Sequence, residues 1–254
     1  MELIALCSFA FLAGLIDSIV GGGGLIQIPA LFIFMPGTAV ATILGTNKLV
    51  SITGTSAAVV FYARKIKLNW LTLLPSAAVA FVFSFLGAKT VSLLSSDILR
   101  PVILLLLIVV AVYTFIKKDF GSQDVPKIKE TRQKVYAIGI GASMGFYDGF
   151  FGAGTGSFLI FLFVEILGFN FLRASAVSKI INTSTNLAAL IYFALNENIL
   201  YHIALPMAVC NVTGSIVGAK LAIAKGSAFV RILFLVVVSA IIIKFAYDTF
   251  FGSK

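Results

Sequence analysis

Residues 14–29 read GLIDSIVGGGGLIQIP and place four consecutive glycines between two apolar runs. The apolar stretch around them, residues 3–35, is too long for one simple membrane-spanning helix. Four glycines disfavour a helix in lipid, where an unpaired backbone group is costly unless protein or a water-filled cavity satisfies it. We therefore expect a helix that is broken in its middle beside a polar cavity, with close glycine-mediated helix packing as the alternative explanation.

The composition assigns the whole chain to the membrane. Of its 254 residues, 60% are hydrophobic and 11% are charged, and the mean hydropathy is +1.08. A second long stretch with a glycine cluster covers residues 135–168, and further apolar runs cover residues 42–62, 71–94, 101–116, 173–195, 200–224 and 230–247. These patterns predict an all-α, polytopic membrane protein of about eight segments.

The two halves of the chain repeat each other. A shift of 131 positions, without any gap, matches Gly14 with Gly145, Asp17 with Asp148, Gly21 with Gly152, Gly23 with Gly154, Lys48 with Lys179 and Pro75 with Pro206. We predict a first membrane repeat at 1–116, a cytoplasmic linker at 117–134 and a second membrane repeat at 135–254. Each repeat would hold one glycine-broken segment, re-entrant or doubled, and three spanning helices. Such repeats are typical of secondary transporters, whose substrate site lies where the halves meet.

The basic residues indicate how the repeats are oriented, because loops rich in Lys and Arg stay in the cytoplasm. The loop at 64–67 carries Arg64, Lys65 and Lys67, whereas its counterpart at 196–198 has no Lys or Arg. The two loops are therefore expected on opposite sides of the inner (plasma) membrane, which makes the repeats inverted. By the same rule both chain termini lie outside the cytoplasm. The net charge of +9 belongs to the short cytoplasmic loops and does not indicate nucleic-acid binding.

Two lysines lie inside apolar runs, at equivalent positions of the repeats. Lys48 and Lys179 would each cost about 2.5–3.5 kcal/mol to insert, so a partner or a wet cavity is expected for them. Snorkelling towards the lipid interface is the alternative. Polar residues at 47, 51 and 55, and at 178, 182 and 186, recur every four residues and so form one stripe on each helix. We expect these stripes to line the transport pathway.

The candidate site combines the glycine clusters with the polar stripes. Amide groups at the start of each returning half-helix would favour an anion. Asp17 and Asp148 are candidates either for carrying a coupling proton or for an ion pair with a lysine. A single histidine and no metal-ligand cluster argue against an enzyme, and we predict no catalytic residue, metal or cofactor. The predicted substrate-binding residues are Gly21, Gly22, Gly23, Gly24, Gln27, Asn47, Lys48, Ser51, Gly152, Gly154, Thr155, Ser157, Lys179, Asn182 and Asn186.

Residues 14–29, followed by Gly-Thr-Asn-Lys-Leu at 45–49 and Tyr-Ala-Arg at 62–64, resemble the TauE/SafE sulfite exporter family, also called the 4-toluene sulfonate uptake permease family. The resemblance covers essentially the whole chain, although Ser178 and Lys179 replace the Asn-Lys pair in the second copy. It implies transport of small sulfur-containing or organic anions such as sulfite or sulfonates. We therefore expect a secondary transporter with a small anionic solute and the lipid bilayer as partners. A passive anion channel is the alternative, and homo-oligomerisation is left open.

Overall fold

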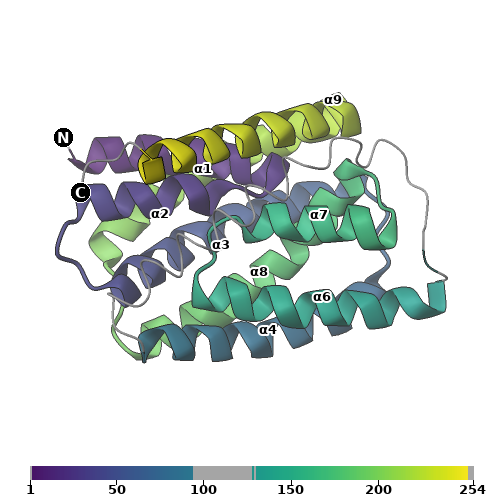
Figure 1. The fold of residues 1–254 in the computed structure, drawn as a ribbon, viewed down its shortest axis with the longest axis horizontal. Coiled ribbons are helices and arrows are strands. Elements are labelled where there is room, and N and C mark those ends of the chain that lie inside the picture. Colours follow the sequence, from purple (N-terminus) through teal and green to yellow (C-terminus); the bar gives the residue numbers. More distant parts are fainter. Residues whose placement is uncertain (1, 94–127, 129, 251–254) are drawn as a thin grey trace.

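The computed structural model describes residues 2–93, 128 and 130–250. The described residues form eight helices and no strand, so the all-α class is confirmed (Figure 1). The predicted run at 101–116 lies outside the described residues. The helices are α1 (Glu2–Val20), α2 (Gly23–Phe34), α3 (Val40–Lys65), α4 (Trp70–Ser92), α6 (Glu130–Phe150), α7 (Thr155–Leu167), α8 (Phe171–Leu195) and α9 (Tyr201–Phe250).

Both long glycine-containing stretches are broken helices. The first break separates α1 from α2, and the second separates α6 from α7. Gly21 and Gly152, which are equivalent in the repeat, have φ of +79° and +80°. Glycine adopts this left-handed conformation without the steric cost that a Cβ atom adds. After each break the chain turns back as a shorter helix. α2 packs along α1, and α7 packs along α6.

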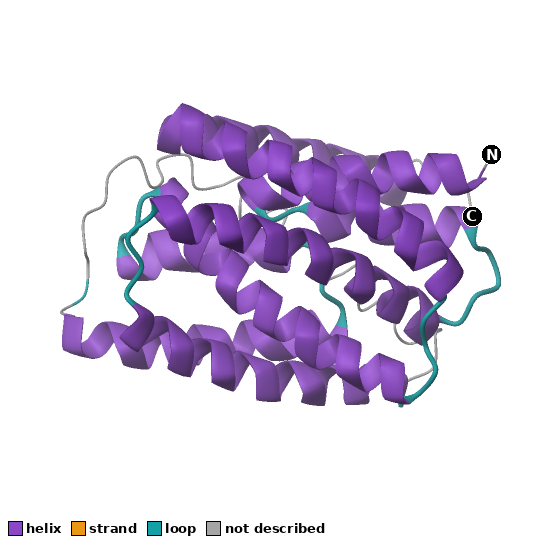
Figure 2. Cartoon of the chain, turned by 180° about the vertical axis from the view of Figure 1, so that it is seen from behind, coloured by secondary structure: helices purple, strands orange, loops and turns teal. Residues whose placement is uncertain are grey.

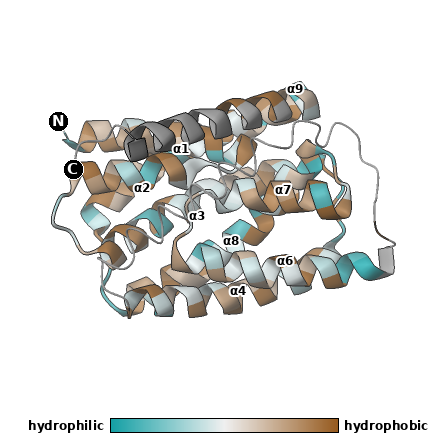
Figure 3. Ribbon diagram, viewed as in Figure 1, coloured by the Kyte–Doolittle hydropathy of each residue, from teal (hydrophilic) through white to brown (hydrophobic). Residues whose placement is uncertain are grey.

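Within the described part of the chain, three helices are long and apolar enough to cross a membrane: Glu2–Val20, Trp70–Ser92 and Tyr201–Val230. The sequence predicts more spanning helices than this. α3 and α8 are long enough, at 26 and 25 residues, but their polar stripes make them less apolar. Figure 3 shows the contrast, with hydrophobic colour dominating α4 and α7 and paler colour on α3. The two runs predicted at 200–224 and 230–247 belong to one element, α9, which bends at Gly226.

Helices from the two halves of the chain are packed against each other. α1 lies along α9, α4 lies along α6, and α3 and α8 cross between these pairs (Figures 1 and 2). Side chains at these contacts donate hydrogen bonds to carbonyls of the neighbouring helix: Ser76 to Ala137, Ser84 to Thr185, Asn211 to Ala10 and Ser215 to Gly14. Small and polar residues at close helix contacts are the usual means of association in lipid.

Candidate functional site

The two broken segments meet at their breaks, near the middle of the bundle. The Ser157 amide donates a hydrogen bond to the Gly21 carbonyl at 3.1 Å, and its hydroxyl donates to the Val20 carbonyl at 2.8 Å. A Cβ atom added at Gly156 would lie 2.5 Å from the Gly21 Cα, well inside van der Waals contact. The glycine clusters therefore allow the backbones of the two halves to touch.

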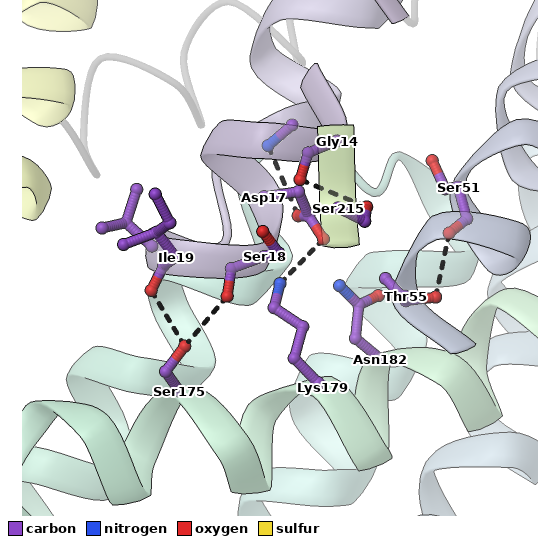
Figure 4. A network of polar contacts seen from close by, with 12 residues as sticks. Gly14, Asp17, Ser18, Ile19, Ser51, Thr55, Ser175, Lys179, Asn182 and Ser215 are labelled. Carbon is purple, nitrogen blue, oxygen red and sulfur yellow. Dashed lines mark hydrogen bonds and ion pairs between the residues drawn. The ribbon is translucent and has the colours of Figure 1, made fainter. Parts of the chain in front are cut away.

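The carbonyl groups at the end of α1 are satisfied by side chains rather than by a continuing helix. The Tyr62 hydroxyl donates to the Ser18 carbonyl at 2.8 Å. The Ser175 hydroxyl donates to the Ile19 carbonyl at 2.9 Å, as Figure 4 shows. Helix ends leave unpaired carbonyls, and in lipid these must find partners within the protein. Neither Tyr62 nor Ser175 is among the predicted site residues, and the Tyr-Ala-Arg motif at 62–64 is the one signal that singles out Tyr62.

Two ion pairs cross between the halves. Lys48 Nζ on α3 lies 2.7 Å from an Asp148 carboxylate oxygen on α6, and Lys179 Nζ on α8 lies 2.7 Å from Asp17 on α1. The side chains of both lysines are at most 2% exposed, so neither extends to the lipid interface as the snorkelling alternative requires. Each lysine thus pairs with the aspartate of the other half, and the formal charges of the four side chains sum to zero.

Pairing is what allows these charges to stay buried. An isolated ion is very costly in a low-dielectric interior, whereas a hydrogen-bonded partner of opposite sign offsets much of that cost. Lys48 has a second, neutral partner, because its ammonium group also donates to Asn186 Oδ1 at 3.1 Å. Asp17 accepts a further, longer hydrogen bond of 3.4 Å from the amide of Gly23, the first residue of α2. That amide of the returning half-helix is therefore used within the protein.

A polar cavity lies between the breaks and the central helices α3 and α8. The space in it that the centre of a water molecule can reach is about 10 Å³, which is roughly what one water molecule requires. The residues that line it are Asp17, Gly21, Gly24, Asn47, Lys48, Ser51, Thr55, Asp148, Gly152, Gly156, Asn182 and Asn186. The cavity as it stands is too small for an anion larger than water.

Most of the predicted site residues gather at this cavity. Lys179 reaches it through its ion pair with Asp17. Thr55 and Gly156 line it but are not in the predicted set, although Thr55 continues the stripe at 47 and 51. Besides Lys179, the predicted residues that do not line it are Gly22, Gly23, Gln27, Gly154, Thr155 and Ser157.

Three of these outlying residues make other contacts. The Thr155 hydroxyl donates to the Gly152 carbonyl, and Ser157 holds the two breaks together. Gln27 accepts a hydrogen bond from Asn211 on α9. These polar groups form hydrogen bonds with backbone carbonyls and with a neighbouring side chain. In a membrane interior such groups need partners within the protein, whether or not they bind a ligand.

Comparison with known proteins places the chain among membrane transporters. A family model described as Sulfite exporter TauE/SafE matches residues 6–245. The probable membrane transporter protein ORF9 of Sinorhizobium sp. is 36% identical over 239 residues, which are 94% of this chain and 90% of that protein. The probable membrane transporter protein YfcA of Escherichia coli strain K12 is 33% identical over 240 residues, 94% of this chain and 88% of that protein.

A probable membrane transporter protein of Haemophilus influenzae is 32% identical over 238 residues, which are 94% of this chain and 92% of that protein. No solved structure shows a significant match to the chain. With the family model matched over nearly all of its length, the chain belongs to the TauE/SafE sulfite exporter family, a family of membrane transporters and not of enzymes.

Proposed function

We propose that the protein is a secondary transporter of small anions, sulfur-containing or organic, such as sulfite or a sulfonate, and that the anion binds where the two halves meet. The observation that carries this proposal is the pair of crossed Lys–Asp contacts in a polar cavity within an otherwise apolar helical bundle. Ionisable residues at such a depth commonly mark a substrate or ion pathway. The family's printed description, a sulfite exporter, supports the choice of substrate class.

The site would bind an oxyanion through one lysine and the neighbouring amides. A lysine ammonium group offers three donors, and the amide groups of Asn47, Asn182 and Asn186 add neutral donors around the same cavity. Because both lysines are already paired, at least one Lys–Asp contact must open for the anion to bind. Because the cavity has room for about one water molecule, the halves must also move apart. Substrate binding is thus coupled to a rearrangement of the two halves.

The proposal includes an architecture of two inverted repeats, at 1–116 and 135–254, joined by a cytoplasmic linker at 117–134. Support comes from the helix bounds, since shifting α1, α2, α3 and α4 by 131 positions brings their starts to within three residues of those of α6, α7, α8 and α9. The packing also repeats, because α4 on α6 is the counterpart of α9 on α1. In Figure 1 α3 and α8 run in opposite directions, as inverted repeats require.

Purified protein in liposomes would test the function directly. Radiolabelled sulfite, thiosulfate and simple sulfonates would be offered under an opposing anion gradient and under a proton gradient. A secondary transporter should accumulate at least one of them above its external concentration. A passive channel can only equilibrate it. Uptake that never exceeds protein-free liposomes for any tested anion would contradict the proposal.

A further inference from the structure

The two ion pairs occupy equivalent positions in the repeat, but their surroundings differ. Lys48 contacts both Asp148 and Asn186, and the Asn186 amide in turn donates to Asn182 Oδ1 at 3.1 Å. Shifting back by 131 positions puts Thr55 in the place of Asn186 and Ser51 in the place of Asn182. In the first half, these shorter side chains occupy the corresponding positions near the Lys179–Asp17 ion pair.

Thr55 does not replace the missing amide. Its hydroxyl donates at 2.9 Å to the Ser51 carbonyl of its own helix (Figure 4). Among the described residues, Asp17 is the one hydrogen-bonding partner of the Lys179 ammonium group. Lys179 is therefore held by a single carboxylate, whereas Lys48 is held by a carboxylate and a neutral amide.

The exposure of the two carboxylates follows the same asymmetry. The Asp17 side chain is 15% exposed and that of Asp148 is 1% exposed, and both line the polar cavity. A residue that retains some exposure to a cavity can exchange a proton or accept a new neighbour without unpacking the protein around it. The Lys179–Asp17 contact is the more accessible of the two.

The charges around Asp17 limit what can enter. α8 contributes Lys179, α3 contributes Lys48, and α6 contributes Asp148, while the Tyr62 hydroxyl is bonded to the Ser18 carbonyl beside it. The residues that α2 and α7 place in the cavity are glycines. Since the four ionised side chains sum to zero, an entering monoanion would leave one uncompensated negative charge in a low-dielectric site.

We infer that Asp17 and Lys179 form the moving ion pair of the transport cycle. In this scheme Asp17 takes up a proton and its contact with Lys179 opens. The Lys179 ammonium group then binds the substrate anion, while the Lys48–Asp148–Asn186 contact remains closed. One proton then accompanies each monovalent anion, which restores the neutrality of the site. The inference rests on the proposed function and adds to it a coupling ion and an unequal role for the two halves.

The repeat supplies a matched pair of variants, Asp17→Asn and Asp148→Asn. Each keeps the shape of the side chain and removes its charge. Methanesulfonate is a suitable radiolabelled probe because it carries one negative charge across the physiological pH range, and sulfite would serve as a second probe. The quantity measured is the ratio of initial uptake with an acidic exterior to uptake at equal pH, normalised to folded protein. A pH-sensitive dye inside the liposomes would record the accompanying protons.

Gly139→Ala serves as a control, because a Cβ atom at that position meets nothing within 4 Å. The wild type, Gly139→Ala and Asp148→Asn should all show a ratio severalfold above one, whatever their absolute rates. Asp17→Asn should show a ratio of about one and no substrate-driven acidification. Equal ratios in the two Asn variants, or a loss confined to Asp148→Asn, would overturn the inference. If the wild type transports neither probe, the result contradicts the proposed anion transport itself. Failure of the proposed function can therefore be told apart from failure of the role assigned to Asp17.

A second variant covers the case in which Asp148→Asn does not fold. Thr55→Asn places an amide at the position equivalent to Asn186, where it can bond Lys179 and reduce the space around Asp17. The variant should fold like the wild type but lower the proton-gradient ratio towards one. A ratio equal to that of the wild type in folded Thr55→Asn protein would count against a moving Lys179–Asp17 contact.

Discussion

Replacing Gly156 with alanine tests whether the halves really meet backbone to backbone at their breaks. The added Cβ would lie 2.5 Å from the Gly21 Cα and 2.8 Å from the Gly21 carbonyl oxygen. Carbon atoms in good contact are about 3.5–4.0 Å apart, so the two segments would have to separate by about 1 Å. The displaced atoms are backbone, which cannot turn aside as a flexible side chain can.

The magnitude follows from two costs and one opposing gain. Overpacking of this kind costs about 1–3 kcal/mol, and strain in the two Ser157 hydrogen bonds to Gly21 and Val20 adds about 1 kcal/mol. Alanine gains about 1 kcal/mol over glycine as a helix former, which offsets part of this loss. We expect a net destabilisation of about 2 kcal/mol, or about 4–8 °C in the thermal midpoint of a chain of this size.

Gly139→Ala is the matched control, because a Cβ atom at that helical position meets nothing within 4 Å. That variant should be as stable as the wild type or slightly more stable. Thermal unfolding of both variants would be followed in the same detergent, and transport would be followed in liposomes. A Gly156→Ala protein with the midpoint of Gly139→Ala would refute the backbone contact, and with it the reasoning on how the halves are joined.

Two other predictions concern the ion pairs and the topology. Lys48→Ala alone should lower the yield of folded protein, since it leaves Asp148 buried and unpaired at a cost of about 3–5 kcal/mol. The double change Lys48→Met with Asp148→Leu should recover the yield and keep the proton-gradient ratio of the wild type, because this pair stays closed in the proposed cycle. A ratio of about one in the folded double variant would show that the pair takes part in coupling. Cysteines at Gln123 and Asn198 should be labelled from opposite sides of the membrane, with Gln123 cytoplasmic, whereas same-side labelling would exclude inverted repeats.

Much of the fold is predictable because a membrane limits the options to a few. Apolar length predicts helices, and clustered glycines predict where they break, as found at Gly21 and Gly152. What length and hydropathy do not give is the partner of each helix. α4 lies along α6 and α1 lies along α9, each in the other half, and this exchange depends on close contacts at small residues that a single sequence does not identify.

The candidate site is predictable in its ingredients but not in its pairings. The repeat points to Lys48, Lys179, Asp17 and Asp148, yet a pair within one half would have satisfied the same pattern. In the structure, both ion pairs join a lysine of one half to an aspartate of the other half. Hydroxyl groups near the breaks were the least predictable, because a serine or threonine there serves backbone carbonyls and a ligand with the same chemistry. Ser157 illustrates this, since its hydroxyl donates a hydrogen bond to the Val20 carbonyl.

The crossed pairing has a mechanical consequence for any substrate that binds a lysine. Had each lysine paired with the aspartate of its own half, opening an ion pair would leave the contact between the halves unchanged. Here the Lys179–Asp17 contact joins α8 to α1, so releasing it removes one of the charged contacts that hold the halves together. A ligand shifts a conformational equilibrium only by its differential affinity for the two states. An anion that competes with Asp17 for Lys179 has that differential affinity, because it binds the state in which this contact between the halves is open.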